Sequence, residues 1–381
     1  MTPIEQARKR IRDWKSGKLD LSFLGLTELP ELPAGLTEFS CSFNRLTKLP
    51  DTLPASLTYL EVTGNRLTKL PETLPADLIE LLCASNQLTN LPETLPATIT
   101  TIYCGTNQLT TLPENLPAAL TALICYGNRL TSLPATLPAA LTDLHCCDNQ
   151  LTALPDTLPV GLRHIHCTRN QLTALSDTLP AALTLLICYG NRLASLPATL
   201  PAGLTEIQCC DNRLTALPDT LPVGLRRLVC NRNLLTRIPD TLPAGLIHLS
   251  CTQNRLIALP ENLPVGLQTL ICSYNWLTRI PNTLPAGLNE LYCAYNQLTT
   301  LPDTVPATLM LLYIDGNPLP ERDDEESILD YVARMKAIAE AASKERIVQR
   351  CGIIFEDLAR KVWHPSRVER LMLAGVDMED M

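Results

Sequence analysis

The stretch LTALICYGNRLTSLPATLPAALTDLHCCDNQLTALP, residues 120–155, carries one pattern twice, and its asparagines Asn128 and Asn149 are 21 residues apart. If such an asparagine is called residue n, fourteen units follow one another with n running from 44 to 317 in steps of 21. Leucine occupies n+2 and an apolar residue occupies n−8 and n−5 in all fourteen, and cysteine occupies n−3 in twelve. A degenerate unit with leucine in the asparagine position, Leu24, precedes them. The chain is therefore a tandem repeat.

The unit L-x-x-L-x-C-x-x-N-x-L is the pattern of a leucine-rich repeat. Side chains alternate across a strand, so the apolar positions point inward and stack on their counterparts in the next coil. We therefore expect a β-rich solenoid whose concave side is a curved, all-parallel sheet. The asparagine should satisfy backbone groups that would otherwise be buried and unpaired. The cysteines at n−3 should act as small hydrophobic side chains in the core.

Prolines define the other side of each coil. Proline occupies n+10 in thirteen successive units and n+6 in twelve of them, with Ser176 as the exception. Two prolines four residues apart exclude a regular helix and favour extended, polyproline-like backbone. The convex side should therefore be thin and free of helix.

The two ends differ from the repeats, and we divide the chain into an N-terminal helical cap (1–18), the solenoid (19–319) and a C-terminal helical cap or module (320–381). Thr2-Pro3-Ile4-Glu5 fits a capping box with proline at the first helical position. In the C-terminal part the pattern predicts a helix over 323–342, a second helix capped by Ser343, and a short one through Val368 and Leu371. Cys351 falls on the apolar face of the second helix, which predicts a core position.

The unit L-P-x-T-L-P-A-x-L-T-x-L-x-C-x-x-N-x-L-T-x-L-P resembles the short, proline-rich leucine-rich repeats of type III secretion effectors from enteric bacteria. The cysteine-bearing variant is also similar to repeat proteins of giant DNA viruses, as is the tail 350–368. Some of the bacterial effectors carry a C-terminal ubiquitin ligase domain with a C-x-D motif. Here Cys351 is followed by Gly352 and Ile353, and about 64 residues follow Asn317. We therefore expect that the ligase domain is absent.

Composition and motifs narrow the function classes. The net charge of −8 gives no reason to expect nucleic-acid binding, and no apolar run of membrane-spanning length occurs. Residues 1–18 lack the apolar segment of a secretory signal. No phosphate-binding loop, dinucleotide fingerprint or zinc-protease motif is found, so we expect no enzymatic activity, no cofactor and no bound metal. The row of cysteine thiols at n−3 is stable in a reducing compartment. This indicates the cytoplasm, or a host's cytoplasm if the source is a pathogen.

The outward positions of each strand (n−7, n−6, n−4, n−2 and n−1) carry the functional signal. They make up 70 of the 381 residues, yet they hold eight of the nine tyrosines and four of the five histidines. Tyrosine and arginine are the side chains that anchor protein interfaces. We expect one cluster on the last three coils and a second line at mid-solenoid, near Arg163. The candidate protein-binding residues are Tyr103, Tyr126, His145, His166, Arg169, Tyr189, Arg232, Tyr274, Tyr292, Tyr295 and Tyr313.

The sequence thus predicts a non-enzymatic module that binds a partner protein on its concave face, and the resemblance implies a host-directed effector. Three alternatives stay open. One is a ubiquitin-pathway enzyme or adaptor that acts through the C-terminal module with Cys351. The second is a metal site at His145, Cys147 and His166. The third is a structural or virion component. The outward aromatics also have a plain structural interpretation, because such residues suit strands and stack on neighbouring coils.

Overall fold

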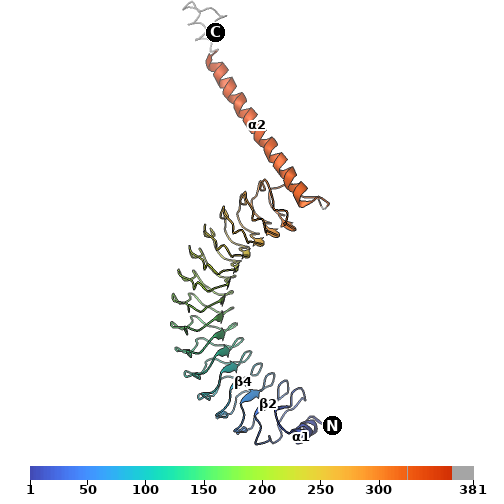
Figure 1. Cartoon of the computed structure of the whole chain (residues 1–381), viewed down its shortest axis with the longest axis vertical. Coiled ribbons are helices and arrows are strands. Elements are labelled where there is room, and N and C mark those ends of the chain that lie inside the picture. The colour runs from blue at the N-terminus through green and yellow to red at the C-terminus, as the bar shows by residue number, and fades with distance from the viewer. Residues whose placement is uncertain (324, 363–381) are drawn as a thin grey trace, which may run out of the picture.

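The computed structural model describes residues 1–323 and 325–362 and shows a curved solenoid with a helix at each end (Figure 1). Helix α1 (Pro3–Asp13) comes first and helix α2 (Ile328–Val362) last. Between them, fifteen three-residue strands form one parallel sheet in chain order. They are β1 (Lys18–Asp20), β2 (Glu38–Ser40), β3 (Tyr59–Glu61), β4 (Glu80–Leu82), β5 (Thr101–Tyr103), β6 (Ala122–Ile124), β7 (Asp143–His145), β8 (His164–His166), β9 (Leu185–Ile187), β10 (Glu206–Gln208), β11 (Arg227–Val229), β12 (His248–Ser250), β13 (Thr269–Ile271), β14 (Glu290–Tyr292) and β15 (Leu311–Tyr313).

The register of the sheet follows the repeat. From β2 onward each residue pairs with the residue 21 positions later, as Glu38 pairs with Tyr59. The degenerate first unit is one residue shorter, since Lys18 pairs with Glu38. The residue at the centre of every strand is buried, and so are the residues at n−3 and n+2 in the fourteen units, except Leu319 in the last unit, which is partly buried. The predicted all-parallel solenoid is confirmed.

The asparagine ladder ties each coil to the one before it. The Asn149 amide nitrogen donates to the carbonyl oxygens of Cys125 in the preceding coil (3.0 Å) and of Cys146 (3.2 Å) and Cys147 (3.0 Å) in its own. Its amide oxygen accepts from the Leu130 backbone nitrogen at 2.9 Å. The same bonds recur along the ladder, so the predicted role of asparagine is confirmed.

The n−3 cysteines form a buried file of free thiols. Burial raises the pKa of Cys104, Cys251 and Cys293 to about 12. A thiol that stays protonated at neutral pH is a poor nucleophile and a poor metal ligand. These side chains therefore serve as core hydrophobes, as the repeat pattern predicted.

The convex side is extended, and the structure places no helix between residues 14 and 327 in the part of the chain that it describes. Each coil closes with a turn in which the carbonyl of the n+10 proline accepts from a backbone nitrogen three residues on, as Pro138 does from Leu141 at 3.0 Å. Proline suits this place because it has no N–H to satisfy.

Helix α1 covers the N-terminal end of the core. The predicted capping box is present: Thr2 Oγ1 accepts from the Glu5 nitrogen, and the Glu5 carboxylate accepts from the Thr2 nitrogen. Arg10 then donates to the Asp20 carbonyl oxygen at 2.8 Å, which links the helix to the end of β1.

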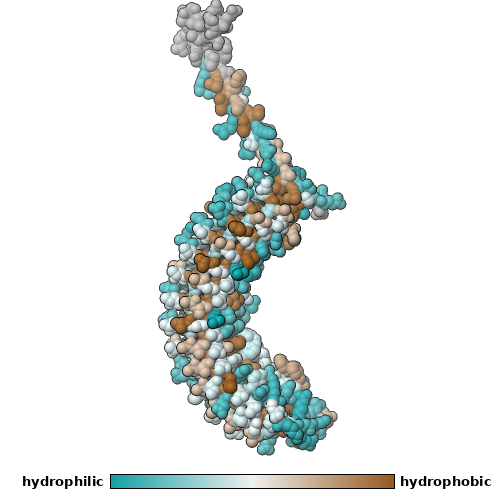
Figure 2. Space-filling model, in the orientation of Figure 1, coloured by the Kyte–Doolittle hydropathy of each residue, from teal (hydrophilic) through white to brown (hydrophobic). Residues whose placement is uncertain are grey.

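Helix α2 departs from the prediction. It is one continuous helix of 35 residues, and Ser343 lies inside it rather than at a cap. Alanine, lysine and glutamate surround Ser343, and these strong helix formers outweigh its capping tendency. The predicted core position of Cys351 is also wrong, because Cys351 is exposed on the distal half of α2, where hydrophobic surface is visible (Figure 2). The predicted helix through Val368 and Leu371 lies outside the described residues. Neither α1 nor α2 combines the length and hydropathy that a bilayer-spanning segment needs.

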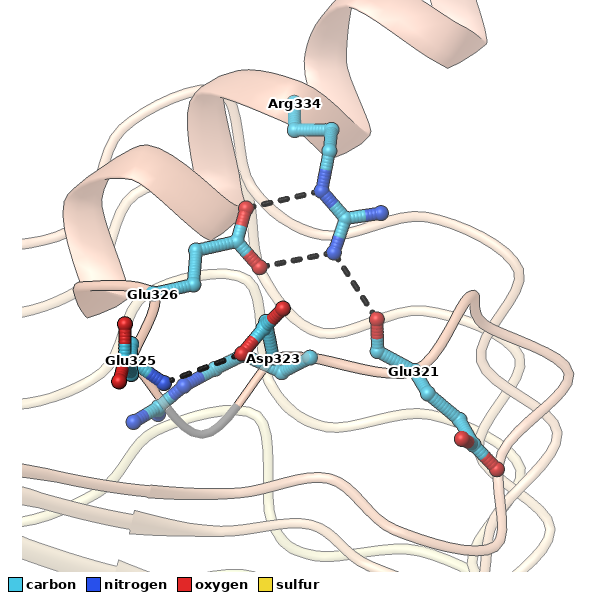
Figure 3. A pocket seen from close by; sticks show the side chains of 6 residues that line it. Glu321, Asp323, Glu325, Glu326 and Arg334 are labelled. Carbon is cyan, nitrogen blue, oxygen red and sulfur yellow. Dashed lines mark hydrogen bonds and ion pairs between the residues drawn. The ribbon is translucent and has the colours of Figure 1, made fainter.

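The first turns of α2 anchor it to the last coil. Tyr331, Val332 and Met335 are buried, and the Tyr331 hydroxyl donates to the Pro320 carbonyl oxygen at 2.7 Å. Arg334 makes two bonds of 2.8 Å to the Glu326 carboxylate and a third to the Glu321 carbonyl oxygen (Figure 3). The base of the helix is therefore held by both apolar and charged contacts.

Candidate functional site

The concave face contains an n−4 row and an n−6 row, which flank the buried centre of each strand, and the n−4 row is the first of the two rows that form the candidate site. Because the central residue points into the core, its neighbours at n−6 and n−4 point outward. From β4 to β15 the n−4 row is mostly apolar or aromatic, and we call it the central ridge. It comprises Leu82, Tyr103, Ile124, His145, His166, Ile187, Gln208, Val229, Ser250, Ile271, Tyr292 and Tyr313.

A second row runs along the n−1 positions, one residue before each asparagine. All fourteen of these residues have positive φ, between 49° and 70°, and only four of them are glycine. Positive φ strains a residue that has a Cβ, and the strain is tolerated where the surrounding structure over-determines the turn. Here the asparagine bonds supply that constraint. The n−1 side chains therefore lie in line, each against its equivalent in the next coil.

The tyrosines of the last coils form two parallel stacks. Tyr292 and Tyr313 stack on the central ridge with centroids 4.7 Å apart and rings within 6° of parallel. Tyr274 and Tyr295 stack in the n−1 row at 4.4 Å and 12°. Gly316 makes room for the second stack, since a Cβ there would lie 2.6 Å from the Tyr295 ring. The predicted cluster on the last three coils is present, and it consists of two pairs of stacked tyrosine rings.

The mid-solenoid line predicted from Tyr103, Tyr126, His145 and His166 forms two contacting pairs. The Tyr103 and Tyr126 hydroxyls lie 2.7 Å apart, and this hydrogen bond together with burial raises the pKa of Tyr103 to about 12. The His145 and His166 rings stack at 4.3 Å and 8°. Burial lowers the pKa of both histidines, and the charge of His145 lowers that of His166 further. At neutral pH the stack is therefore uncharged.

An ion pair flanks the histidine stack. His164 Nδ1 contacts the Asp143 carboxylate from the neighbouring strand. Burial by itself would raise the pKa of Asp143, but hydrogen bonds from Thr142 and His164 outweigh it and lower that pKa. These two residues could not be coupled from the sequence pattern, because their pairing depends on the register of β7 and β8.

The candidate arginines are paired rather than free. Arg169 Nη1 lies 3.4 Å from Asp148 and its guanidinium lies over the Tyr189 ring. Arg232 Nη1 lies 3.5 Å from Asp211, and its Nε donates to a neighbouring glutamine at 2.7 Å. The two aspartates were missed from sequence, although they occupy the same n−1 position as the arginines one coil earlier.

Sequence reasoning also missed the aliphatic part of the central ridge. Leu82, Ile124, Ile187 and Ile271 are only partly buried, and Val229 is nearly covered by its neighbours. The alternation that selected the tyrosines would have selected these side chains too. Ile187, Val229 and Ile271 extend the apolar surface from the histidine stack toward the C-terminal tyrosines, in alternation with Gln208 and Ser250.

The alternative metal site at His145, Cys147 and His166 is not supported by the arrangement of the described side chains. No group of three or more histidine, cysteine or acidic side chains is placed to hold a metal ion within residues 1–323 and 325–362. Cys147, which the sequence suggested as a third ligand beside these histidines, is half-buried and carries a free thiol. A pocket lined by four acidic residues together with Arg322 and Arg334 lies at the base of α2 (Figure 3).

The solved structures identify the relatives. YopM from Yersinia enterocolitica WA-314 matches with 39% identity and a TM-score of 0.79 over 84% of this chain and 69% of that one. YopM from Yersinia pestis, described as a leucine-rich effector protein, matches with 35% identity and a TM-score of 0.68 over 82% and 93%. The functional domain of InlJ from Listeria monocytogenes, which includes a cysteine ladder, matches with 27% identity and a TM-score of 0.63 over 76% and 69%.

No protein-family model and no curated protein sequence matches the chain. The cysteine file of this chain parallels the cysteine ladder of InlJ. The identity with the two YopM structures and the coverage of their lengths decide the assignment. The chain is a leucine-rich repeat protein of the YopM effector family.

Proposed function

We propose that this chain is a non-enzymatic effector that binds one partner protein across its concave face, in the cytoplasm of a host cell. The observation that carries the proposal is the central ridge: a stacked histidine pair and a stacked tyrosine pair on one sheet, with Ile187, Val229 and Ile271 among the five residues between them. Tyrosine contributes large contact area at a low entropy cost, and rings already stacked lose little freedom on binding. The membership in the YopM effector family supports an effector role.

The binding residues that we propose are those of the ridge together with the n−1 row beside it. The Tyr292 and Tyr313 stack anchors one end of the contact, and the His145 and His166 stack the other. The paired arginines at 169 and 232 lie on the rim, where they contribute to specificity and association rate more than to affinity. A partner that covers this surface would be an elongated protein that follows the curve.

The test is quantitative capture from a eukaryotic cell extract with the full-length chain. We expect Tyr292→Ala/Tyr313→Ala to lose the captured partner by at least about tenfold, the effect typical of removing an aromatic anchor. The matched control is Val160→Ala/Val223→Ala, since both valines are more than 80% exposed in the proline turns. Equal capture by all three proteins would refute the proposal.

A further inference from the structure

The distal half of α2 carries an apolar stripe that the solenoid does not cover. The stripe consists of Ile347, Val348, Ile354, Phe355 and Leu358, whose exposed fractions run from 54% to 73%, with exposed Cys351 at its centre. We call these residues the distal stripe. Lys344 and Lys361 follow the same face and mark its two ends. Large apolar side chains gathered on one face of a solvent-exposed helix indicate an interaction surface.

The distal stripe is not a continuation of the face that anchors α2. Tyr331, Val332 and Met335 face the last coil and are buried. At about 100° per residue, the centre of the distal stripe lies roughly 150° around the helix from this anchoring face. The stripe therefore points away from the direction in which α2 contacts its own solenoid.

We infer that the distal stripe binds the distal stripe of a second copy of this chain in an antiparallel two-helix coiled coil. The spacing is that of alternating core positions: Ile347, Cys351, Ile354 and Leu358 are separated by four, three and four residues. Val348 and Phe355 lie on one flank and widen the apolar face. Helices with such a repeat bury it by pairing side by side.

The antiparallel register makes the stripe complementary to itself. It places Ile347 against Leu358 of the second copy, and Cys351 against Ile354. It also places Lys344 opposite Lys361 of the second copy, and these like charges mark where the apolar pairing ends at each side. On the charged flank, Arg350 and Asp357 lie one heptad apart, so Arg350 of each copy faces Asp357 of the other. Asp357 also pairs with Lys361 of its own helix at 2.7 Å, so Arg350 would share a carboxylate that is already held in place. A twofold axis between the helices makes every contact occur twice, as in other symmetric dimers.

The parallel arrangement lacks this complementarity. It would bring Arg350 next to Phe355 of the second copy, where it meets no opposite charge. The solenoid also favours the antiparallel form, because α2 leads away from the last coil (Figure 1). Antiparallel helices carry the two solenoids to opposite ends of the pair, where they do not collide.

The size of the stripe fits a dimer. Five large side chains per helix, each exposing roughly 100 Å², supply about 1,000 Å² from two copies, the lower limit for a specific interface. The dimer would present two concave faces, so a multimeric or surface-bound partner would be held more tightly than by one face. Dimerisation does not depend on what the concave face binds. A negative result for the dimer would therefore leave the proposed binding function untouched, and a negative capture result would leave the dimer untouched.

Sedimentation velocity of the full-length protein tests the inference. We expect a species of about 84 kDa, twice the 41.9 kDa of the chain, that dissociates on dilution from about 50 to 1 µM. Ile354→Glu should weaken the dimer by at least about a hundredfold, because it buries a charge in the interface. The matched control is Ile353→Glu on the same helix: Ile353 is 68% exposed and lies on the side opposite the stripe, so the dimer should persist.

A charge exchange tests the orientation. Arg350→Asp and Asp357→Arg each create two like-charge contacts and should weaken the dimer by about five- to tenfold. The double variant restores opposite charges and should recover wild-type affinity. A monomer at 50 µM would overturn the inference, and this includes the case in which residues 363–381 of the same chain cover the stripe. Equal loss with Ile353→Glu, or a double variant weaker than either single one, would also overturn it.

Discussion

Replacing Asn149 with alanine tests the asparagine ladder, which holds successive coils together. The amide of Asn149 is buried, and its removal leaves the Leu130 nitrogen without a partner. The carbonyl oxygens of Cys125 and Cys146 each lose one of two bonds, because they still accept from Asn128 and Asn170. The side-chain nitrogen has two hydrogens, so three full bonds are lost, one accepted and two donated. With a net value near 1 kcal/mol for each bond and an added cost for the one buried nitrogen left unpaired, we expect a loss of about 3–4 kcal/mol.

The assay is urea unfolding followed by circular dichroism at 222 nm, with hydrogen exchange to locate the change. Repeat proteins couple mainly to their nearest neighbours, so the loss of protection should centre on the two coils that Asn149 joins. Asn90→Ala is the matched control, because Asn90 is exposed outside the ladder and should change stability by less than about 0.5 kcal/mol. A loss below about 1 kcal/mol at Asn149 would show that the ladder bonds are replaceable and that the argument from buried polar groups is wrong.

Three further predictions follow from the same geometry. Burial raises the pKa of the n−3 thiols, so these thiols should resist iodoacetamide at pH 8 in the folded protein while the exposed Cys351 reacts. Peptide mass spectrometry measures the labelling of each cysteine, and equal labelling of buried and exposed thiols would contradict the prediction. Because the pKa of His145 and of His166 is lowered in the folded state, the unfolded chain binds more protons as pH falls below about 6.5; stability should drop between roughly pH 7 and 5. A His145→Phe/His166→Phe variant should flatten that drop in thermal melts, and an unchanged slope would contradict the assignment. Gly316→Ala should lower the free energy of unfolding by about 1–3 kcal/mol, because φ at Gly316 is 68° and the new Cβ would meet the Tyr295 ring. Gly35→Ala is the control, since a Cβ at Gly35 has open space around it and should be tolerated. Similar melting temperatures for the two variants would refute the packing argument.

The cysteines illustrate how a reactive residue type can have a purely structural role. Their regular spacing alone leaves open metal binding, redox chemistry and packing. The structure places twelve of them in one buried file in which burial suppresses ionisation. Cysteine is small enough to fit where strands of successive coils approach one another, and it adds apolar contact without the bulk of leucine.

Much of the solenoid could be predicted because each coil repeats the same local problem. The apolar positions, the asparagine and the prolines recur every 21 residues, so every coil must bury the same face and pair the same backbone groups. The capping box at Thr2 and Glu5 was equally readable, since capping depends on residues three positions apart. The outward position of the tyrosines followed from strand alternation alone.

What the sequence could not determine depends on contacts between coils or on competition between local signals. Whether Tyr292 stacks on Tyr313, or Arg169 pairs with Asp148, is decided by the register that brings residues 21 positions apart into contact. The helix signal at Ser343 was misjudged because a capping serine is only a weak preference, and the helix formers around it decided the outcome. Cys351 was placed in a core because an apolar stripe on a helix shows that something should cover it, but only the tertiary structure reveals that the chain's own solenoid does not.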